Sequence, residues 1–241
     1  MLIFTYSIIY LVVFATGAVI GSFLLVPLFS YLFLRRKHCN CKKSISSPYV
    51  TVGVASGLSA VLSWSAFMPP FGFLTKSLSI SLPETFSPGN AILYFSMLLC
   101  LIAIAWIDIE TMEIPDSLNI AIAVCGVIAI FIGPDIGLKS HLIGLAVAAV
   151  PLFLLALFVD GSFGFGDVKL MAAAGIFLGW KSTLTALFIG IIIGGVIGAV
   201  LLITKRKSRT DHFAFGPSLC FGIGLAMFAG TDIINLYLGY S

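Results

Sequence analysis

Long apolar runs, separated by short polar segments, make up most of this chain. A helix that crosses a bilayer needs about 20 mostly apolar residues. By that measure the pattern predicts eight membrane helices, at residues 7–34, 49–69, 91–109, 117–133, 139–159, 168–180, 183–203 and 215–237. The sixth is short, which suits a helix that begins inside the protein. We therefore expect an all-α, polytopic membrane bundle.

Composition supports a membrane protein. The chain is 60% hydrophobic and only 10% charged, whereas a soluble domain carries about 25% charged residues. The basic residues gather in two clusters, at 35–43 and 205–209. Beside apolar segments such clusters are typical of cytoplasmic anchors. We therefore expect the lipid bilayer as a partner and no nucleic acid.

The two basic clusters also predict the topology. If loop 35–48 is cytoplasmic, the N-terminus lies outside. Alternation through eight spans then makes three more loops cytoplasmic, at 110–116, 160–167 and 204–214. The second basic cluster falls in the last of these, so the two clusters agree on one orientation.

Two polar segments each place an aspartate at the edge of an apolar run. Asp108 ends one run, and Asp167 follows Gly164-Phe-Gly166 and opens another. A carboxylate in such a place is costly and is by default a functional hypothesis. The positive end of a helix dipole favours the ionised form of Asp167, and Lys169 adds to this unless it points away. Taken alone, Asp167 is better interpreted as an N-cap, and the presence of a second aspartate favours a functional interpretation.

The segment after Asp108 contains a helix breaker. Pro115 disfavours helix at the preceding residue, so the chain is expected to restart at Asp116 or Ser117. Asp116 then sits where an N-cap belongs, and a structural cap is its favoured interpretation. Glu110 and Glu113 are interpreted as solvated loop charges.

A pair of carboxylates suggests a definite chemistry. Two of them within hydrogen-bond reach share one proton. The ionised member can take a proton from water while the neutral member donates to the scissile carbonyl oxygen. This is the chemistry of an aspartic protease, which needs no metal and no covalent nucleophile. Cys39 and Cys41 lack the second cysteine pair that a zinc site needs, so we expect no metal.

An ordered set of motifs carries a resemblance to a known family. The set comprises Gly21-Ser-Phe-Leu24, Ile107-Asp108 with Ile114-Pro115-Asp116, Gly164-Phe-Gly166-Asp167-Val-Lys169-Leu170, and Phe215-Gly216-Pro217. In order and spacing it resembles the type IV prepilin leader peptidases, membrane aspartic proteases of the Gly-x-Gly-Asp type.

The resemblance implies roles for particular residues. Asp108 and Asp167 are implied to be the catalytic pair, with Pro115, Asp116, Gly164, Gly166 and Lys169 shaping the site or binding substrate. The implied substrates are prepilins or pseudopilin-like proteins of type IV pili and protein secretion. They carry a short basic leader, a glycine and a hydrophobic helix, and are cut at the cytoplasmic face of a prokaryotic inner membrane.

The N-terminal part departs from the family pattern. Many members also methylate the new N-terminus with S-adenosylmethionine and carry a long loop with two Cys-x-x-Cys pairs. Here the loop is short and holds only Cys39 and Cys41, and Leu25 replaces the usual asparagine. We therefore expect residues 1–90 to hold a reduced or absent methyltransferase part and 91–241 to form the peptidase domain. No cofactor is expected unless methyl transfer is retained.

Three other functions stay open. A bifunctional peptidase would also methylate its product. A presenilin-like protease is disfavoured, because that family expects an aspartate after tyrosine deep in a span, whereas Asp108 follows Ile107 near a loop. A proton-coupled transporter would often show inverted repeats, and the sequence shows no repeat.

Overall fold

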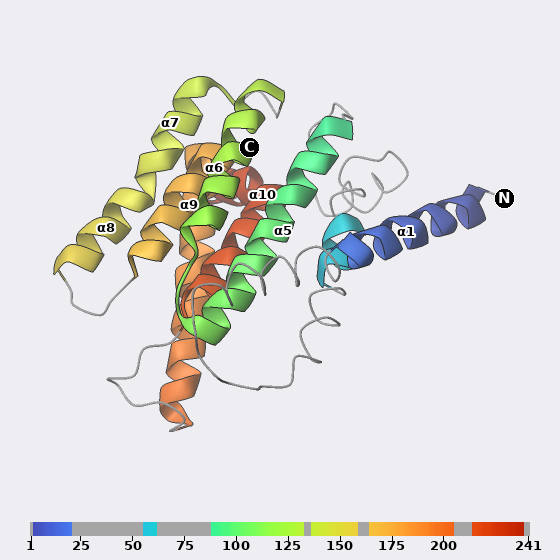
Figure 1. Ribbon diagram of the computed structural model, residues 1–241. Coiled ribbons are helices and arrows are strands. Elements are labelled where there is room, and N and C mark those ends of the chain that lie inside the picture. The colour runs from blue at the N-terminus through green and yellow to red at the C-terminus, as the bar shows by residue number, and fades with distance from the viewer. Residues whose placement is uncertain are drawn as a thin grey trace.

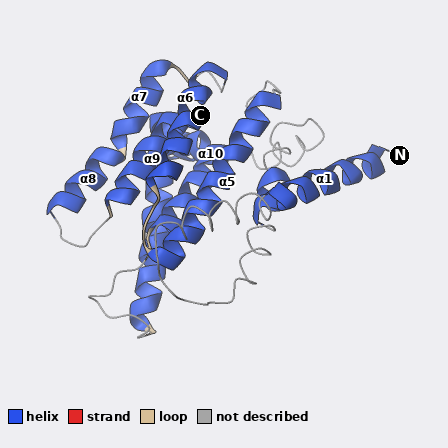
Figure 2. Ribbon diagram, in the orientation of Figure 1, coloured by secondary structure: helices blue, strands red, loops and turns tan. Residues whose placement is uncertain are grey.

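The computed structural model describes residues 2–20, 55–61, 88–132, 136–158, 164–204 and 214–238. Within these ranges the regular structure is entirely helical, as Figure 2 shows. The helices, labelled as in Figure 1, are α1 (Leu2–Val19), α5 (Pro88–Thr111), α6 (Asp116–Ile132), α7 (Leu138–Val147), α8 (Ala149–Phe158), α9 (Phe165–Ile203) and α10 (Gly216–Leu238). The all-α prediction is confirmed for the described residues.

Four stretches of the described chain are long and apolar enough to cross a membrane. They are Gly89–Thr111, Leu138–Phe158, Phe165–Ile203 and Gly216–Tyr237, and α6 is a shorter apolar helix. Large apolar side chains such as Phe131, Phe158 and Ile203 are more than three-quarters exposed, as suits faces that meet lipid. The predicted span 7–34 is described as far as residue 20 and is helical there, whereas 49–69 is described only at 55–61.

The predicted sixth and seventh spans prove to be two limbs of one element. α9 is broken at a single residue, Gly179, whose φ of 72° lies in the left-handed region that glycine adopts without strain. Figure 1 shows the first limb, 165–178, rising beside α7 and α8, and the second limb, 180–203, running back along α10. The first limb is about 20 Å long, shorter than the hydrocarbon core of a bilayer.

Glycines let the limbs of α9 approach their neighbours closely. Gly175 of the first limb meets Gly144 of α7 backbone to backbone. Gly190 of the second limb lies against Leu219 of α10, and Gly194 lies against Phe215, the residue before α10. Small residues at such crossings are how helices pack in lipid, where little hydrophobic force acts between them.

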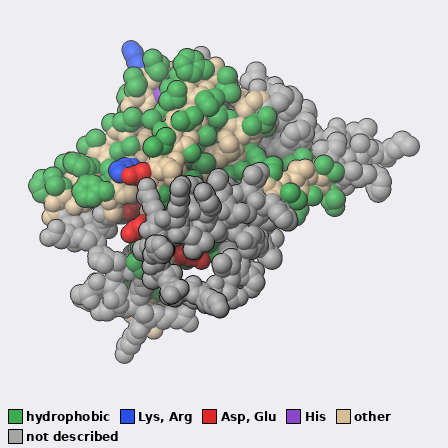
Figure 3. Space-filling view, viewed as in Figure 1, with side chains coloured by type: hydrophobic (Ala, Val, Ile, Leu, Met, Phe, Trp, Pro, Cys, Tyr) green, Lys and Arg blue, Asp and Glu red, His purple; other side chains and the backbone are tan. Residues whose placement is uncertain are grey.

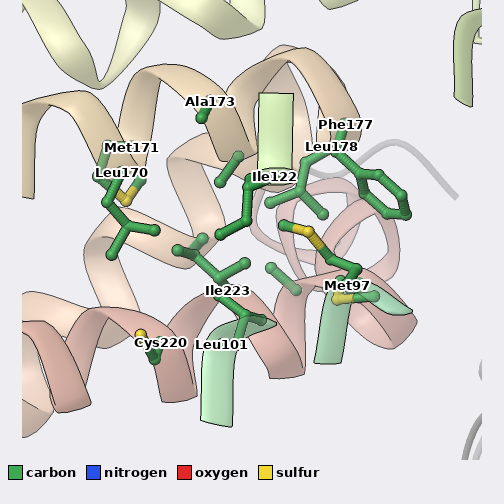
Figure 4. Packing of buried hydrophobic residues seen from close by; sticks show 14 of the residues in the cluster. Met97, Leu101, Ile122, Leu170, Met171, Ala173, Phe177, Leu178, Cys220 and Ile223 are labelled. Atoms are coloured by element: carbon green, nitrogen blue, oxygen red, sulfur yellow. The ribbon is translucent and has the colours of Figure 1, made fainter. Parts of the chain in front are cut away.

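The core is the layer in which α5, α6, α9 and α10 meet. Met97, Ile122, Leu170, Met171 and Ile223 are fully buried. Figure 4 shows Ile122 reaching between the residues of α9 and those of α10. Because this core joins α5 and α6 to α9 and α10, which lie farther along the chain, it fixes how the ends of these helices lie relative to one another.

Candidate active site

Asp108 lies in the last turn of α5 and is only 5% exposed. Its Oδ2 accepts a hydrogen bond of 2.9 Å from the backbone N–H of Gly216, the first residue of α10. The first N–H groups of a helix have no partner inside the helix and readily bind a carboxylate. A Cβ on Gly216 would come within 2.7 Å of Asp108 Oδ2. Only a glycine at position 216 therefore leaves room for the Asp108 carboxylate.

Asp167 lies in the first turn of α9 and is 7% exposed. The N-cap position belongs to Gly164, and Asp167 stands three residues on. Its Oδ2 accepts a hydrogen bond of 3.1 Å from the Gly164 N–H. The interpretation of Asp167 as the N-cap itself is thus wrong by three positions, because its carboxylate caps the helix from inside the first turn.

The structure brings these two carboxylates to one end of the bundle. They are near enough to repel each other electrostatically. The thiol of Cys220, which is buried in α10, interacts with both. The end of α5 and the starts of α9 and α10 therefore form one site around Asp108 and Asp167, which we name the aspartate pair.

Asp116 and Lys169 form an exposed ion pair beside the aspartate pair. Lys169 Nζ lies 2.7 Å from Asp116 Oδ1, and the side chains are 56% and 68% exposed. The Pro115 carbonyl accepts the N–H groups of Leu118 and Asn119, so the N-cap of α6 is Pro115. The prediction that Asp116 is the cap is wrong by one residue, because its carboxylate turns outward to Lys169. Lys169 correspondingly points away from Asp167.

The two glycines before Asp167 have different surroundings. A Cβ on Gly166 would lie 3.0 Å from Ile114 Cβ, so the backbone here presses on the segment that precedes α6. A Cβ on Gly164 would meet Asp167 Oδ2 at 3.5 Å, an ordinary contact. Of these two glycines, only Gly166 is required for the close approach of the α9 backbone to Ile114.

Gly216 is the site residue that sequence reasoning missed. It belongs to the Phe215-Gly216-Pro217 motif, but its contribution is a backbone N–H, which leaves no chemical mark in a sequence. The proline after it, at a position typical of helix starts, was the available signal.

Exposed acidic side chains lie beside the site. Glu110 and Glu113 are exposed at the end of α5 and just after it, and Figure 3 shows acidic side chains at separate places along the edge of a mainly hydrophobic face, one of them beside a basic side chain. In the part of the chain that the structure describes, no three histidine, cysteine or acidic side chains gather as metal ligands. Cys39 and Cys41 lie outside the described residues.

Comparison with known proteins gives two family matches. Residues 95–199 match the type IV leader peptidase family, and this range includes both aspartates. Residues 14–67 match the bacterial peptidase A24 N-terminal domain. The two matches follow each other along the chain in the order that the motifs imply.

Curated relatives match over most of the chain. The prepilin leader peptidase/N-methyltransferase of Legionella pneumophila is 33% identical over 226 residues, which cover 89% of this chain and 70% of the relative. The chain belongs to the type IV leader peptidase family. Proteins of the same name from Stutzerimonas stutzeri and Aeromonas hydrophila are 30% and 27% identical, over 90% and 88% of this chain and 70% and 69% of their own length.

No solved structure matches this member of the type IV leader peptidase family. Its family membership agrees with the resemblance that the motifs carried.

Proposed function

We propose that this chain is a membrane aspartic endopeptidase that removes the basic leader from prepilin or pseudopilin-like substrates. The observation that carries the proposal is the aspartate pair. Two carboxylates from α5 and α9 are buried at one end of the bundle, interact electrostatically, and each accept one backbone hydrogen bond. Prepilin leader peptidase is also the activity named for the relatives.

In the proposed reaction the pair acts as base and acid. The ionised carboxylate removes a proton from water as the water oxygen attacks the scissile carbonyl carbon. The neutral carboxyl group donates its proton to the carbonyl oxygen, giving a tetrahedral intermediate. Collapse of this intermediate breaks the C–N bond, and the proton held by the first carboxylate passes to the departing amine. As the carbonyl group re-forms, one hydroxyl proton returns to the second carboxylate, which restores the starting state. The backbone N–H groups of Gly216 and Gly164 hold the two carboxylates in place throughout.

The surroundings of the pair suit a substrate with a basic leader. Glu110 and Glu113 are exposed near the end of α5, so they would attract cationic residues over distances up to roughly 10 Å. The hydrophobic helix that follows the leader could remain in lipid while its N-terminal end reaches the site.

The proposed setting is the prokaryotic inner membrane, with eight spans and the aspartate pair at the cytoplasmic face. The orientation rests on the basic clusters at 35–43 and 205–209. Reporter fusions would test it. By this topology a reporter in the loop at 205–213 lies in the cytoplasm, and one at the C-terminal end lies outside.

The direct test is cleavage of a co-expressed prepilin by wild type, Asp108→Asn and Asp167→Asn. Both asparagine variants are expected to lose at least about a thousand-fold in rate, because neither can complete the proton transfers. Asp232→Asn, in the far part of α10, is the matched control and should cleave normally. Normal cleavage by either site variant would refute the paired-acid mechanism.

A second candidate activity is methylation of the new N-terminus, which the relatives' full name and the match at residues 14–67 bring into consideration. It would need S-adenosylmethionine and would divide the chain into a methyltransferase part within 1–90 and a peptidase part at 91–241. The mass of the cleaved product tests it, since methylation adds one methyl group. We expect an unmethylated product, because the cysteine-rich loop is short.

A further inference from the structure

Asn119 is a buried polar residue that the proposed mechanism does not use. It lies in the first turn of α6 and is 6% exposed, and neither Oδ1 nor Nδ2 has a hydrogen-bond partner. Nearby buried polar groups in the described chain are satisfied, as Asp108 and Asp167 illustrate. A buried amide with both polar atoms unpaired is costly, so it calls for an explanation.

The register of α6 against α9 gives the depth of Asn119 in the bundle. Two close approaches define this register, Ile114 with Gly166 and Gly126 with Ile176. The helices run parallel, so Asn119 lies level with Leu170, one turn beyond Asp167 on the same face. Three residues along a helix correspond to about 4.5 Å. Asn119 is therefore in the layer directly beneath the aspartate pair.

The side-chain directions narrow this separation. Helical side chains lean toward the N-terminus of their own helix. Since α6 begins at the site, Asn119 leans toward the aspartates. α5 ends at the site, so Asp108 leans inward, toward the layer of Asn119. A single water can bridge two polar groups that lie roughly 5 to 5.5 Å apart, so it could link the side chains of these two adjacent layers.

We infer that Asn119 is a positioning residue of the aspartate pair, its carboxamide hydrogen-bonding a water that also bonds Asp108 or Asp167. A carboxamide both donates and accepts, so it can hold this water whichever aspartate carries the proton. The inference rests on the proposed peptidase function and extends it. Leu170, which lies level with Asn119 on α9, offers no such group.

Three titratable side chains face this layer. They are Asp108 from α5, Asp167 from α9 and Cys220 from α10, which interacts electrostatically with both aspartates. Asp116 and Lys169 pair with each other on the exposed side. A change in the pH dependence of cleavage caused by Asn119 would therefore act through the aspartate pair.

The test compares Asn119→Leu with Asn90→Leu. Leucine keeps the branched shape of asparagine, with a somewhat larger volume, and removes its hydrogen bonds. Asn90 is the matched control, since it is 4% exposed with an unpaired Oδ1 but lies in the first turn of α5, at the opposite end of that helix from Asp108. Asn119→Leu is expected to lower kcat about 10- to 100-fold, change KM by less than about two-fold, and shift the pH–rate profile by about one unit. Asn90→Leu should change none of these.

A second pair of variants guards against failure to fold. Asn119→Ala and Asn119→Ser differ by one hydroxyl group, and the serine variant should retain at least about five-fold more kcat. Equal kcat for these two, wild-type kinetics for Asn119→Leu, or the same loss in Asn90→Leu would each overturn the inference. If Asp108→Asn abolishes cleavage while Asn119→Leu has wild-type kinetics, only the inference about Asn119 is refuted. If Asp108→Asn cleaves normally, the proposed function itself is refuted.

Discussion

Replacing Gly216 by alanine tests whether the seat of Asp108 depends on a missing side chain. The new Cβ would lie 2.7 Å from Oδ2, 3.0 Å from Cγ and 3.3 Å from Cβ of Asp108. Ordinary contact begins near about 3.4 Å, so the carboxylate must retreat by roughly 0.7 Å. The backbone N–H of residue 216 remains in the variant, so the perturbation is purely steric.

The retreat has a calculable cost for catalysis. It would lengthen the 2.9 Å hydrogen bond from Gly216 to Asp108 beyond good geometry. A hydrogen bond to a charged group contributes about 1.5–3 kcal/mol, which corresponds to roughly 10- to 100-fold in rate. A misplacement near 1 Å alone has an effect of about 100-fold. We therefore expect Gly216→Ala to lower kcat at least about 30-fold.

The assay separates this effect from unfolding. Cleavage of a prepilin in detergent gives kcat and KM, and thermal unfolding of the same sample gives stability. The free energy of unfolding of Gly216→Ala should differ from that of wild type by less than about 1 kcal/mol. Alanine has a higher helix propensity than glycine by a similar amount, which offsets the cost of the steric contact. Gly195→Ala is the matched control, since a Cβ there meets nothing within 4 Å.

Two results would refute the reasoning about Gly216. Wild-type kcat in Gly216→Ala would mean that the carboxylate of Asp108 is free to move without consequence. An equal loss in Gly195→Ala would mean that the assay reports a general effect of the substitution.

Other sites give further predictions. Gly164→Ala should keep kcat/KM within about three-fold, whereas Gly166→Ala should lose at least about ten-fold, because only the second Cβ meets a tight 3.0 Å contact; cleavage kinetics check both, and equal losses would contradict the contrast. Lys169→Met should lower stability by at most about 1 kcal/mol, since its ion pair with Asp116 is exposed; a melting curve checks this, and a larger loss would assign the pair a structural role. Gly144→Val should abolish accumulation of folded protein, because its side chain would enter the backbone of α9; a monodisperse size-exclusion peak would refute it.

Hydrophobic pattern alone predicted several helices to within a few residues. The spans expected at 91–109, 117–133 and 215–237 correspond to α5, α6 and α10. Their ends coincide with polar residues, proline or glycine, and such residues are visible in a sequence. The break expected between 180 and 183 lies at Gly179, but the sequence did not show that one residue reverses the chain. A glycine in an apolar run gives no sign of its φ angle.

The site was predicted unevenly for a related reason. Charged side chains in an apolar chain, such as Asp108 and Asp167, can be recognised in the sequence because burying them is costly. Their partners are backbone groups, and these have no sequence signature. The partner of Lys169 was also missed, because Asp116 lies 53 residues away in the chain and meets it only through packing of α6 on α9.

The two aspartates depend on the bundle in different ways. Asp167 is held by Gly164, three residues away, so its position is set within the first turn of α9. Asp108 is held by Gly216, 108 residues away, so its position exists only when α5 packs against α10. Loosening that packing would therefore displace Asp108 while leaving every helix and Asp167 intact. Since both carboxylates must meet one water, cleavage should report on the α5–α10 contact more sensitively than helix content does.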